Sequence, residues 1–345
     1  MHITHINLAR GFAGGERQTA LLIGKLSELG LGQCLVCKKD SPLRTFLKNT
    51  PGLSFRKAQN MFSGHGFGFK KTDLFHAHEA KAAHWAFLET RICKKPYVIT
   101  RRVPNPLKRN RLTTTAYQRA DAVVAISTTI KQILSAYAAG LNLSVIPSAI
   151  GELPSRPKNV SRLKSRYGDL FVVGHIGTLR DRAKGQTNLI EAAEILNAKH
   201  PGFHFVFLGK GEDERMLKSR AEGIKNIEFA GFTEYPGDYL AVMDLFAFPS
   251  PDEGLGSSIL DAMAYGVPVI ASNVGGIPDI VRHEQNGLLI PPRNSRALAD
   301  AISKLYESPE SRRQFSAEGR ATAASFSPEA MGERYLDLYR KILVG

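Results

Sequence analysis

The sequence predicts an α/β protein with two Rossmann-like domains, each a parallel sheet flanked by helices. The chain has 345 residues, which is enough for two complete cores. Short apolar runs alternate with helix-like segments, an order typical of βαβ units. Residues 151–157 (GELPSRP) interrupt this order with the composition of a linker. We therefore predict domains at 1–150 and 151–327, and a terminal helix over 328–345.

The composition is that of an ordinary globular protein. Apolar residues make up 43% of the chain and charged residues 23%. No apolar run approaches the ~20 residues that span a bilayer, and the N-terminal MHITHINLAR lacks the layout of a signal peptide. Three cysteines, an odd number, favour a reducing cytoplasm over a disulfide framework. We interpret Cys34 and Cys37 as buried thiols rather than as a redox or metal pair.

Positive charge is concentrated in the first half of the chain. Residues 1–150 contain 22 Lys and Arg against 7 Asp and Glu (+15), whereas residues 151–345 contain 24 against 25 (−1). This segregation predicts an anionic partner for the first domain: nucleic acid, a phosphorylated glycolipid or the inner membrane surface. The segment 91–119 is rich in Lys and Arg. We interpret it as an acceptor or membrane patch, with a solvated basic loop as the alternative.

The first domain opens with a strand, a glycine turn and a helix. Residues 2–8 alternate as a buried strand does, Gly11, Gly14 and Gly15 follow, and a helix is predicted over 16–29. Such a unit can hold a phosphate, although the glycine fingerprint of dinucleotide sites and the P-loop Lys are both absent. Further along, the glycine-rich segment 63–69 predicts a mobile loop at the mouth of a site.

A second polar strand end lies at 73–79. His76 and His78 form a His-x-His pair there, and we expect the two side chains to point to opposite faces, so that at most one faces a site. A metal site is disfavoured, because nothing nearby completes a ligand set apart from the distant His84. The remaining elements predicted for this domain are strands over 96–100, 122–126 and 143–146 and a helix that ends at 137.

The second domain repeats the order of strand, polar loop and helix. A strand over 170–176 leads into the loop 177–185, and a helix is predicted over 186–199. The loop carries several cations at the C-terminal end of a strand, a position that favours a ligand role over simple solvation. The other predicted elements are strands over 203–208, 227–232, 245–248 and 267–271 and helices that begin at 295, 309 and 328.

The stretch 249–269 (PSPDEGLGSSILDAMAYGVPV) carries the strongest signal. It joins two apolar strands through a glycine loop and a helix. Glycines let a ligand approach the backbone, and the unpaired amides of a helix N-terminus attract phosphate. Two carboxylates nearby can accept hydrogen bonds from hydroxyls, so the stretch suits a ligand that is part phosphate and part sugar. A capped helix with acids facing solvent is the alternative.

This stretch resembles the signature of retaining glycosyltransferases of the GT-B fold, family four (glycosyl transferases group 1). That signature is a Glu, seven residues, a second Glu and then Ala-Met-Ala-x-Gly-x-Pro. Here Glu253 is followed after seven residues by Asp261, one methylene shorter than Glu, and then by AMAYGVP at 262–268. The resemblance implies two Rossmann-like domains whose sheets face across a cleft, with the last helix packing back onto the first domain.

The resemblance also implies roles for individual residues. Glu253 would face the donor sugar, and Arg180 and Lys184 would hold its diphosphate. His78 completes the implied catalytic set. The implied donor-binding residues are Gly15, Arg102, Arg182, Gly209, Phe232, Thr233, Gly254, Gly256, Ser257, Ser258 and Asp261. The implied acceptor-binding residues are Glu16, Arg17 and Arg101. Arg102 stands where the family usually has a His, which makes this pocket more cationic.

The implied reaction transfers a sugar from a nucleotide-diphosphate sugar to a glycolipid or polysaccharide, such as a lipopolysaccharide core or a related cell-envelope glycan. It needs no cofactor besides the donor and no essential metal. We expect a cytoplasmic enzyme, peripherally bound to the inner membrane through its basic domain. Two alternatives stay open, a GT-B nucleotide-sugar epimerase and a non-catalytic homologue that binds an anionic polymer. Nucleic acid is a disfavoured partner, because the basic half lacks interleaved aromatics and a known binding motif.

Overall fold

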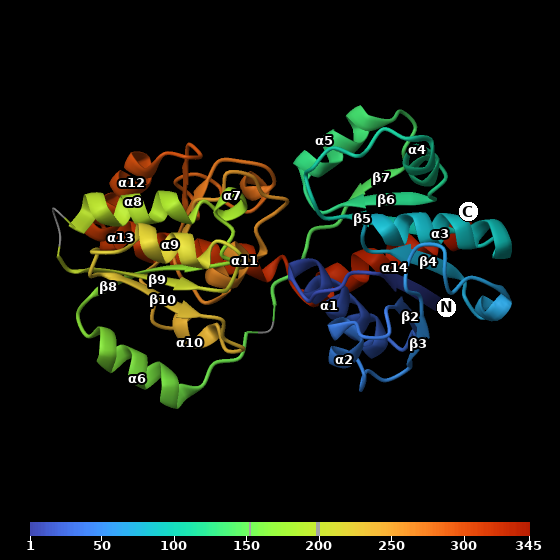
Figure 1. Cartoon of the computed structure of the whole chain (residues 1–345), viewed down its shortest axis with the longest axis horizontal. Helices are drawn as coiled ribbons and strands as arrows, with labels where there is room; N and C mark the ends of the chain where they lie inside the picture. The colour runs from blue at the N-terminus through green and yellow to red at the C-terminus, as the bar shows by residue number, and fades with distance from the viewer. Residues whose placement is uncertain (152, 198–200) are drawn as a thin grey trace. The chain divides into compact units, whose positions relative to one another are not determined.

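The computed structural model describes residues 1–151, 153–197 and 201–345, which form two compact units. The first unit is Met1–Gly151 together with Phe326–Gly345, and the second is Glu152–Ser325 (Figure 1). These limits fall close to the predicted boundaries at 150/151 and 327/328. One residue of the predicted linker, Glu152, lies outside the described residues. Each unit has one parallel sheet with helices on both faces, the predicted α/β class.

The first unit is built on a seven-stranded sheet with the strand order β3-β2-β1-β4-β5-β6-β7. All of its strand pairs are parallel. The strands are β1 (His2–Asn7), β2 (Gly32–Cys37), β3 (Leu53–Lys57), β4 (Leu74–Ala77), β5 (Tyr97–Arg101), β6 (Ala122–Ala125) and β7 (Leu143–Val145). The chain builds outward from β1 to β3 and then returns to β4. The strand order therefore reverses between β1 and β4, and open α/β sheets bind their ligands at the C-terminal edge of such a point.

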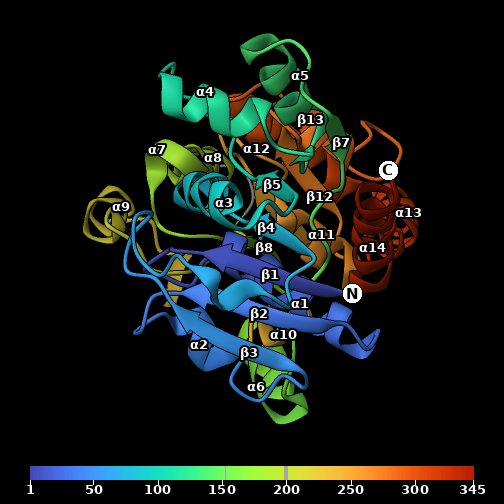
Figure 2. The same cartoon turned by 90° about the vertical axis from the view of Figure 1, so that its right-hand side faces the viewer.

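Helices cover both faces of this sheet (Figure 2). They are α1 (Gly14–Glu28), α2 (Pro42–Phe46), the 3₁₀ helix η1 (Phe67–Phe69), α3 (Ala80–Cys93), α4 (Arg111–Gln118), α5 (Thr128–Tyr137) and α14 (Pro328–Val344). Leu22 of α1 and Tyr335 of α14 share one core with Leu74 of β4. Phe75, the next residue of β4, points to the other face and packs against Trp85 of α3. The terminal helix α14 is thus part of the first unit's core.

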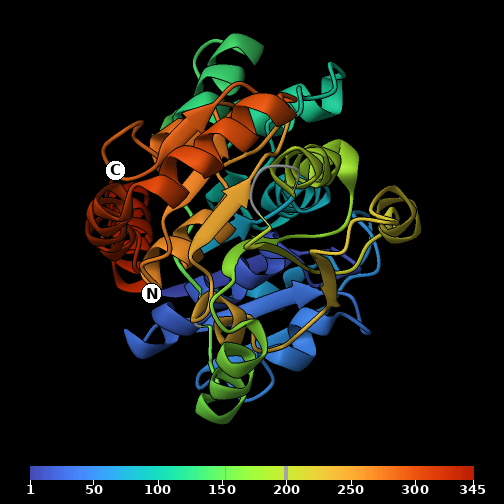
Figure 3. The same cartoon turned by 90° about the vertical axis from the view of Figure 1, so that its left-hand side faces the viewer.

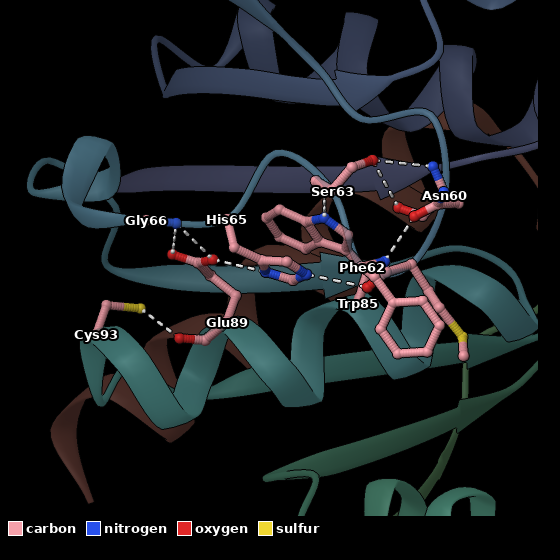
Figure 4. Close-up of polar contacts among 9 residues, drawn as sticks. Asn60, Phe62, Ser63, His65, Gly66, Trp85, Glu89 and Cys93 are labelled. Atoms are coloured by element: carbon pink, nitrogen blue, oxygen red, sulfur yellow. Dashed lines mark hydrogen bonds and ion pairs between the residues drawn. The ribbon is translucent and has the colours of Figure 1, made fainter.

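The loop before η1 is tied to α3 (Figure 4). Trp85 donates its indole N–H to the carbonyl of Ser63 at 2.8 Å, and His65 Nδ1 lies 2.8 Å from the fully buried carboxylate of Glu89. The His65 ring also stacks on Trp85, with ring centroids 4.7 Å apart. The glycine content of this segment predicted a mobile loop. The structure shows a loop anchored at both points, because α3 supplies partners that lie 22 and 24 residues further along the chain.

The second unit has a six-stranded sheet with the order β10-β9-β8-β11-β12-β13 (Figure 3). Its strands are β8 (Phe171–Ile176), β9 (Phe203–Leu208), β10 (Ile227–Gly231), β11 (Leu245–Phe248), β12 (Val269–Ser272) and β13 (Leu288–Ile290). All of its strand pairs are parallel. The strand order reverses between β8 and β11, as it does between β1 and β4 in the first unit. The C-terminal ends of β8 and β11 are therefore where a ligand is expected.

Helices flank this second sheet as well. They are α6 (Pro157–Tyr167), α7 (Asp181–Lys184), α8 (Gln186–Asn197), α9 (Glu214–Arg220), α10 (Gly237–Leu240), α11 (Ser257–Ala264), the 3₁₀ helix η2 (Ile277–Asp279), α12 (Ser295–Glu307) and α13 (Pro309–Ala324). Leu189 of α8 and Leu298 of α12 share one core with Phe205 of β9, while α6 and α10 pack together on the opposite face (Figure 1).

The predicted helices agree closely with the observed ones. Helices α12, α13 and α14 begin at the predicted residues 295, 309 and 328. The helix predicted over 186–199 is described to Asn197, and its last two predicted residues lie outside the described residues. Within the described part of the chain, no helix combines the length and apolar character that crossing a bilayer requires.

Candidate functional site

Two loops at the β8/β11 reversal point bring Lys184 and Glu253 together. Lys184 ends α7, after β8, and Glu253 lies in the loop after β11. The Lys184 Nζ lies 2.5 Å from Oε2 of Glu253, and both side chains are largely buried (23% and 17% exposed). The same Nζ lies 5.0 Å from the centroid of the Phe248 ring, a contact that favours a cation. A paired Lys and Glu therefore stand at the edge of the sheet where a ligand is expected.

Two glycines allow the loops after β8 and β12 to approach the loop after β11. Gly185 has φ +65°, and a Cβ built on it would lie 2.2 Å from the carbonyl oxygen of Pro249. Gly275 has φ +53°, and its Cβ would lie 1.9 Å from the carbonyl oxygen of Glu253. The amide of Gly276 donates to that same carbonyl at 3.1 Å. The turn at 273–276 therefore fixes the backbone of Glu253, while the contact with Lys184 holds its carboxylate.

Helix α11 begins directly after Glu253 and presents an open N-terminus. Its N-cap residue, Gly256, is in the left-handed region (φ +90°), and no side chain within the described residues caps the helix. Ser257 and Ser258 form the first turn and are partly exposed, whereas Gly254 and Gly256 are buried. The first amides of a helix lack intrahelical acceptors and carry the positive end of the dipole. This end of α11 can therefore bind an anion such as phosphate.

The other residues expected at the donor are spread over the same edge. Asp261 lies on α11, one turn after the serines, and is partly exposed. Gly209 follows β9 with φ +141°, and its Cβ would lie 1.9 Å from the carbonyl oxygen of Gly177. Two of these residues follow β10. The Phe232 side chain is 65% exposed, and the Thr233 hydroxyl accepts a hydrogen bond from the amide of Tyr235. No described contact joins Phe232 or Thr233 to the Lys184–Glu253 pair.

The structure does not bring Arg180 and Lys184 together. The Arg180 Nε lies 2.7 Å from Oε1 of Glu212, and both side chains are more than half exposed. Arg182 is also exposed. Glu212 comes from the loop after β9, a partner that the sequence of the Arg180 loop does not reveal. Arg180 thus holds a surface ion pair, while Lys184 alone of these three cations contacts Glu253 in the described structure.

In the first unit, Arg102 lies beside the start of α1. A Cβ built on Gly15, in the first turn of α1, would lie 3.6 Å from Cδ of Arg102. The Nη1 of Arg102 is 3.4 Å from Oγ of Ser148, whereas its Nε and Nη2 are buried and have no partner within the described ranges. Burial lowers the pKa of Arg102. An anion or another acceptor at this position would satisfy the two unpaired groups.

The three residues expected at the acceptor have different environments. Arg101 is buried and donates to the carbonyl of Asn105, so it anchors the loop after β5. Glu16 accepts a hydrogen bond from the amide of the N-cap residue Ala13 at 2.9 Å, which is the Glu half of a capping box. Arg17 is exposed. Of the three, Arg17 therefore offers the most accessible charge.

The prediction that His76 and His78 point to opposite faces is wrong. Side chains alternate along a strand with a period of two, so residues two apart share a face. The two rings lie 3.9 Å apart between centroids, on the face covered by α14, where His76 contacts Tyr339. The prediction that nothing nearby completes a ligand set is also wrong, because His5 of β1 lies beside both rings. One potential ligand atom from each of the three histidines lies within 4.8 Å of the others.

Hydrogen bonds account for five of the six ring nitrogens of these histidines. His76 Nε2 lies 2.7 Å from Thr100 Oγ1, and His76 Nδ1 lies 2.6 Å from the hydroxyl of Tyr339. His5 contacts Gln33 through Nε2 and His78 through Nδ1, each at 3.0 Å. Of these six ring nitrogens, only Nδ1 of His78 is buried without a partner among the described residues. An ion bound by all three rings would have to break at least one of these hydrogen bonds.

Burial keeps all three histidines neutral near pH 7. It lowers the pKa of His5 to about 4 and holds the pKa values of His76 and His78 well below their usual range. The sequence analysis did not predict that His5 and Gln33 belong to this cluster of hydrogen-bonded side chains. The available signal was a polar side chain inside an otherwise apolar, buried strand, since such groups need specific partners.

Comparisons with known proteins show which family the second unit resembles and which fold the chain shares. Residues 159–322 match the family model for glycosyl transferases group 1. The chain is 31% identical over 226 residues to a GDP-mannose-dependent monoacylated alpha-(1-6)-phosphatidylinositol monomannoside mannosyltransferase of Corynebacterium glutamicum, with 61% of this chain and 59% of that protein covered. It is 32% identical over 174 residues to the lipopolysaccharide core biosynthesis glycosyltransferase LpsE of Rhizobium meliloti (49% and 50% covered). The chain thus spans between half and three-fifths of these curated relatives.

The fold of the whole chain is shared with solved structures. The crystal structure of HepE from Anabaena in complex with UDP matches with a TM-score of 0.85 at 20% identity, over 99% of this chain and 100% of that one. Both units are therefore Rossmann-like domains of the GT-B fold.

Proposed function

We propose that the chain is a retaining glycosyltransferase that uses a nucleotide-diphosphate sugar, in line with the match of residues 159–322 to the family model for glycosyl transferases group 1. The observation that carries this proposal is the arrangement at the β8/β11 reversal point. There a largely buried Lys184–Glu253 pair adjoins the open N-terminus of α11. A cation and helix amides suit a diphosphate, and a fixed carboxylate suits sugar hydroxyls.

The proposed reaction breaks the bond between sugar C1 and the leaving phosphate oxygen. The acceptor oxygen bonds to C1 on the same face, the acceptor's proton passes to the leaving phosphate, and a nucleoside diphosphate departs. Negative charge grows on that diphosphate, so preorganised positive groups lower the barrier, each by ~3 kcal/mol. In this proposal Lys184, Arg180 and the α11 amides supply that charge in place of a metal. Glu253 positions the donor hydroxyls, and Asp261 binds the ribose.

The donor proposal is tested by ligand-induced stabilisation. UDP-, GDP-, ADP- and TDP-sugars should be compared in a thermal-shift screen, because a ligand raises the apparent stability according to its affinity. We expect one nucleotide class to raise the melting temperature far more than the others. Transfer with retention would then appear as product of unchanged anomeric configuration by NMR. Stabilisation by none of the four classes would contradict the proposal.

Arg180 gives a sharper form of this test. If it leaves Glu212 to bind the diphosphate, then Glu212→Gln should tighten donor binding several-fold, because the competing carboxylate is gone. Arg180→Ala should weaken binding by about tenfold, the effect of one charge-assisted contact of ~1.5 kcal/mol. Isothermal titration with the donor found in the screen measures both constants. If both variants bind the donor as tightly as the wild-type protein does, Arg180 has no role at the diphosphate.

For the acceptor, we propose a phosphorylated or otherwise anionic membrane glycolipid. The names of these two relatives refer to a phosphatidylinositol mannoside and to lipopolysaccharide core. The charge of +15 over residues 1–150 supports an anionic partner for the first unit and a peripheral position at the inner membrane. Liposomes that contain anionic lipid should bind the protein at low salt and release it at high salt. Equal binding to neutral liposomes would contradict this.

A nucleotide-sugar epimerase is the second candidate, because it would use the same donor site. The two functions separate in an assay that contains only enzyme and donor. An epimerase converts the donor to its isomer, whereas a transferase leaves the donor intact until an acceptor is added.

A further inference from the structure

The orientation of one buried amide in the first unit is fixed by its neighbours. Gln33, on β2, is fully buried, and its side-chain Nε2 donates to the carbonyl of Ile23 at 2.9 Å. A carbonyl oxygen only accepts, so the Gln33 NH₂ group must face Ile23. Its Oε1 therefore faces Nε2 of His5 at 3.0 Å. Because Oε1 only accepts, the proton on His5 must be on Nε2.

This arrangement determines the tautomers of two histidines in turn. His5 is fully buried and neutral, so with its proton on Nε2 its Nδ1 carries a lone pair. That Nδ1 lies 3.0 Å from Nε2 of His78, which must then donate. His78 is also neutral, so its own Nδ1 carries the remaining lone pair. Gln33 thus sets the tautomer of His78 through His5.

The lone pair of His78 is left without a donor. His78 is 3% exposed, and its Nδ1 is buried with no hydrogen-bond partner within the described residues. Buried polar atoms in native proteins are nearly always paired, so an orphan acceptor indicates a partner that arrives with a ligand. His78 directly follows β4, at the C-terminal edge of the sheet where the strand order reverses against β1. The orphan atom is therefore at the ligand-binding edge of the first unit.

We propose that Gln33 and His5 are positioning residues that hold His78 as a hydrogen-bond acceptor, and that His78 Nδ1 accepts from a sugar hydroxyl of the substrate. This inference rests on the proposed function for the sugar chemistry of the ligand. A lone pair repels phosphate oxygens, so His78 recognises a hydroxyl and not the phosphate of the substrate. His78 Nδ1 accepts a hydrogen bond, whereas the guanidinium of Arg102 nearby can only donate one.

The tautomers are measurable without any activity. In ¹⁵N-histidine-labelled protein, multiple-bond ¹H–¹⁵N spectra separate protonated from unprotonated ring nitrogens, and single His→Gln substitutions assign them. We expect Nε2 protonated and Nδ1 bare in both His5 and His78. His175 of β8 is an internal reference of opposite tautomer, since its Nδ1 lies 3.0 Å from the carbonyl of Ala247 and must carry the proton. A protonated Nδ1 on His78 would overturn the proposal.

Two substitutions at Gln33 test the relay itself. Gln33→Met is close in length but removes the acceptor for His5, so His5 and His78 should populate both tautomers. Gln33→Glu keeps the relay if the buried carboxyl is protonated, because its O–H can donate to Ile23 and its C=O can accept from His5. We therefore expect the wild-type tautomers in Gln33→Glu and mixed tautomers in Gln33→Met. Wild-type tautomers in Gln33→Met would show that Gln33 does not set them, and His175 should be unchanged in both variants.

Probe titrations test the ligand. UDP-glucose and GDP-mannose represent the donor, methyl α-mannoside represents a free saccharide acceptor, and inorganic phosphate is the negative control. We expect at least one sugar probe to shift the His78 Nδ1 resonance and phosphate to leave it in place. A shift with phosphate, or with no sugar probe at saturation, overturns the hydroxyl assignment. Absence of transferase activity would refute the proposed function but leave the tautomer result as it stands, so the two failures are distinguishable.

Discussion

Lys184→Ala is expected to lower the turnover number for sugar transfer by a factor of about 10² to 10³. Lys184 is the cation held against Glu253 at the β8/β11 edge, and removal of one preorganised positive group from a leaving oxyanion has this effect in other enzymes. Glu253→Gln should lower turnover by a similar factor, because the carboxylate that fixes both Lys184 and the donor hydroxyls is lost. Steady-state kinetics with the donor from the thermal-shift screen measure both variants.

The two residues should also be coupled. They contact each other, so the effects of Lys184→Ala and Glu253→Gln on the turnover number should not add. The double variant should turn over little more slowly than the less active of the two single variants. Lys218→Ala is the matched control, because Lys218 pairs with Glu214 in the same unit through an exposed contact of 2.7 Å. Its turnover should equal that of wild type. A Lys184→Ala enzyme within threefold of wild type would remove the central support for the proposed function.

The second unit could be predicted well because its evidence is local in the sequence. Glu253, the α11 N-terminus and Asp261 all lie within the single stretch 249–269, so residue spacing alone places them on one loop and one helix. Lys184 could be predicted as a cation at a strand end for the same reason. The partner of Arg180 could not, because Glu212 comes from the next βα loop and only the packing of two loops brings them together.

The first unit contains contacts that cannot be predicted from local sequence. His5, Gln33 and His78 meet although His5 is 28 residues from Gln33 and 73 from His78. Their meeting depends on the strand order β2-β1-β4, which periodicity does not encode. The wrong assignment of His76 and His78 to opposite faces was a different kind of error. The strand was predicted correctly, and its period of two already required both rings to share a face.

Truncation of the chain after Ser325 is expected to unfold the first unit while the second unit stays folded. The truncation removes α14, whose buried side chains include Met331, Tyr335, Leu336 and Tyr339. Loss of one large buried side chain costs about 2–5 kcal/mol, and a domain has only about 5–15 kcal/mol in total. Removal of all four therefore exceeds what the first unit can lose. Calorimetry should show one transition missing and the other retained.

Helix α14 packs directly against α1. Lys25 of α1 forms an ion pair with Glu329 at 2.6 Å, and a Cβ on Gly332 would lie 2.5 Å from Cγ of Lys25, so the two helices are in close contact. A matched control is truncation after Arg340, since the five residues it removes (341–345) are exposed or only partly buried. That variant should keep both transitions. If the protein truncated after Ser325 also keeps both transitions, α14 is not part of the first unit's cooperative core.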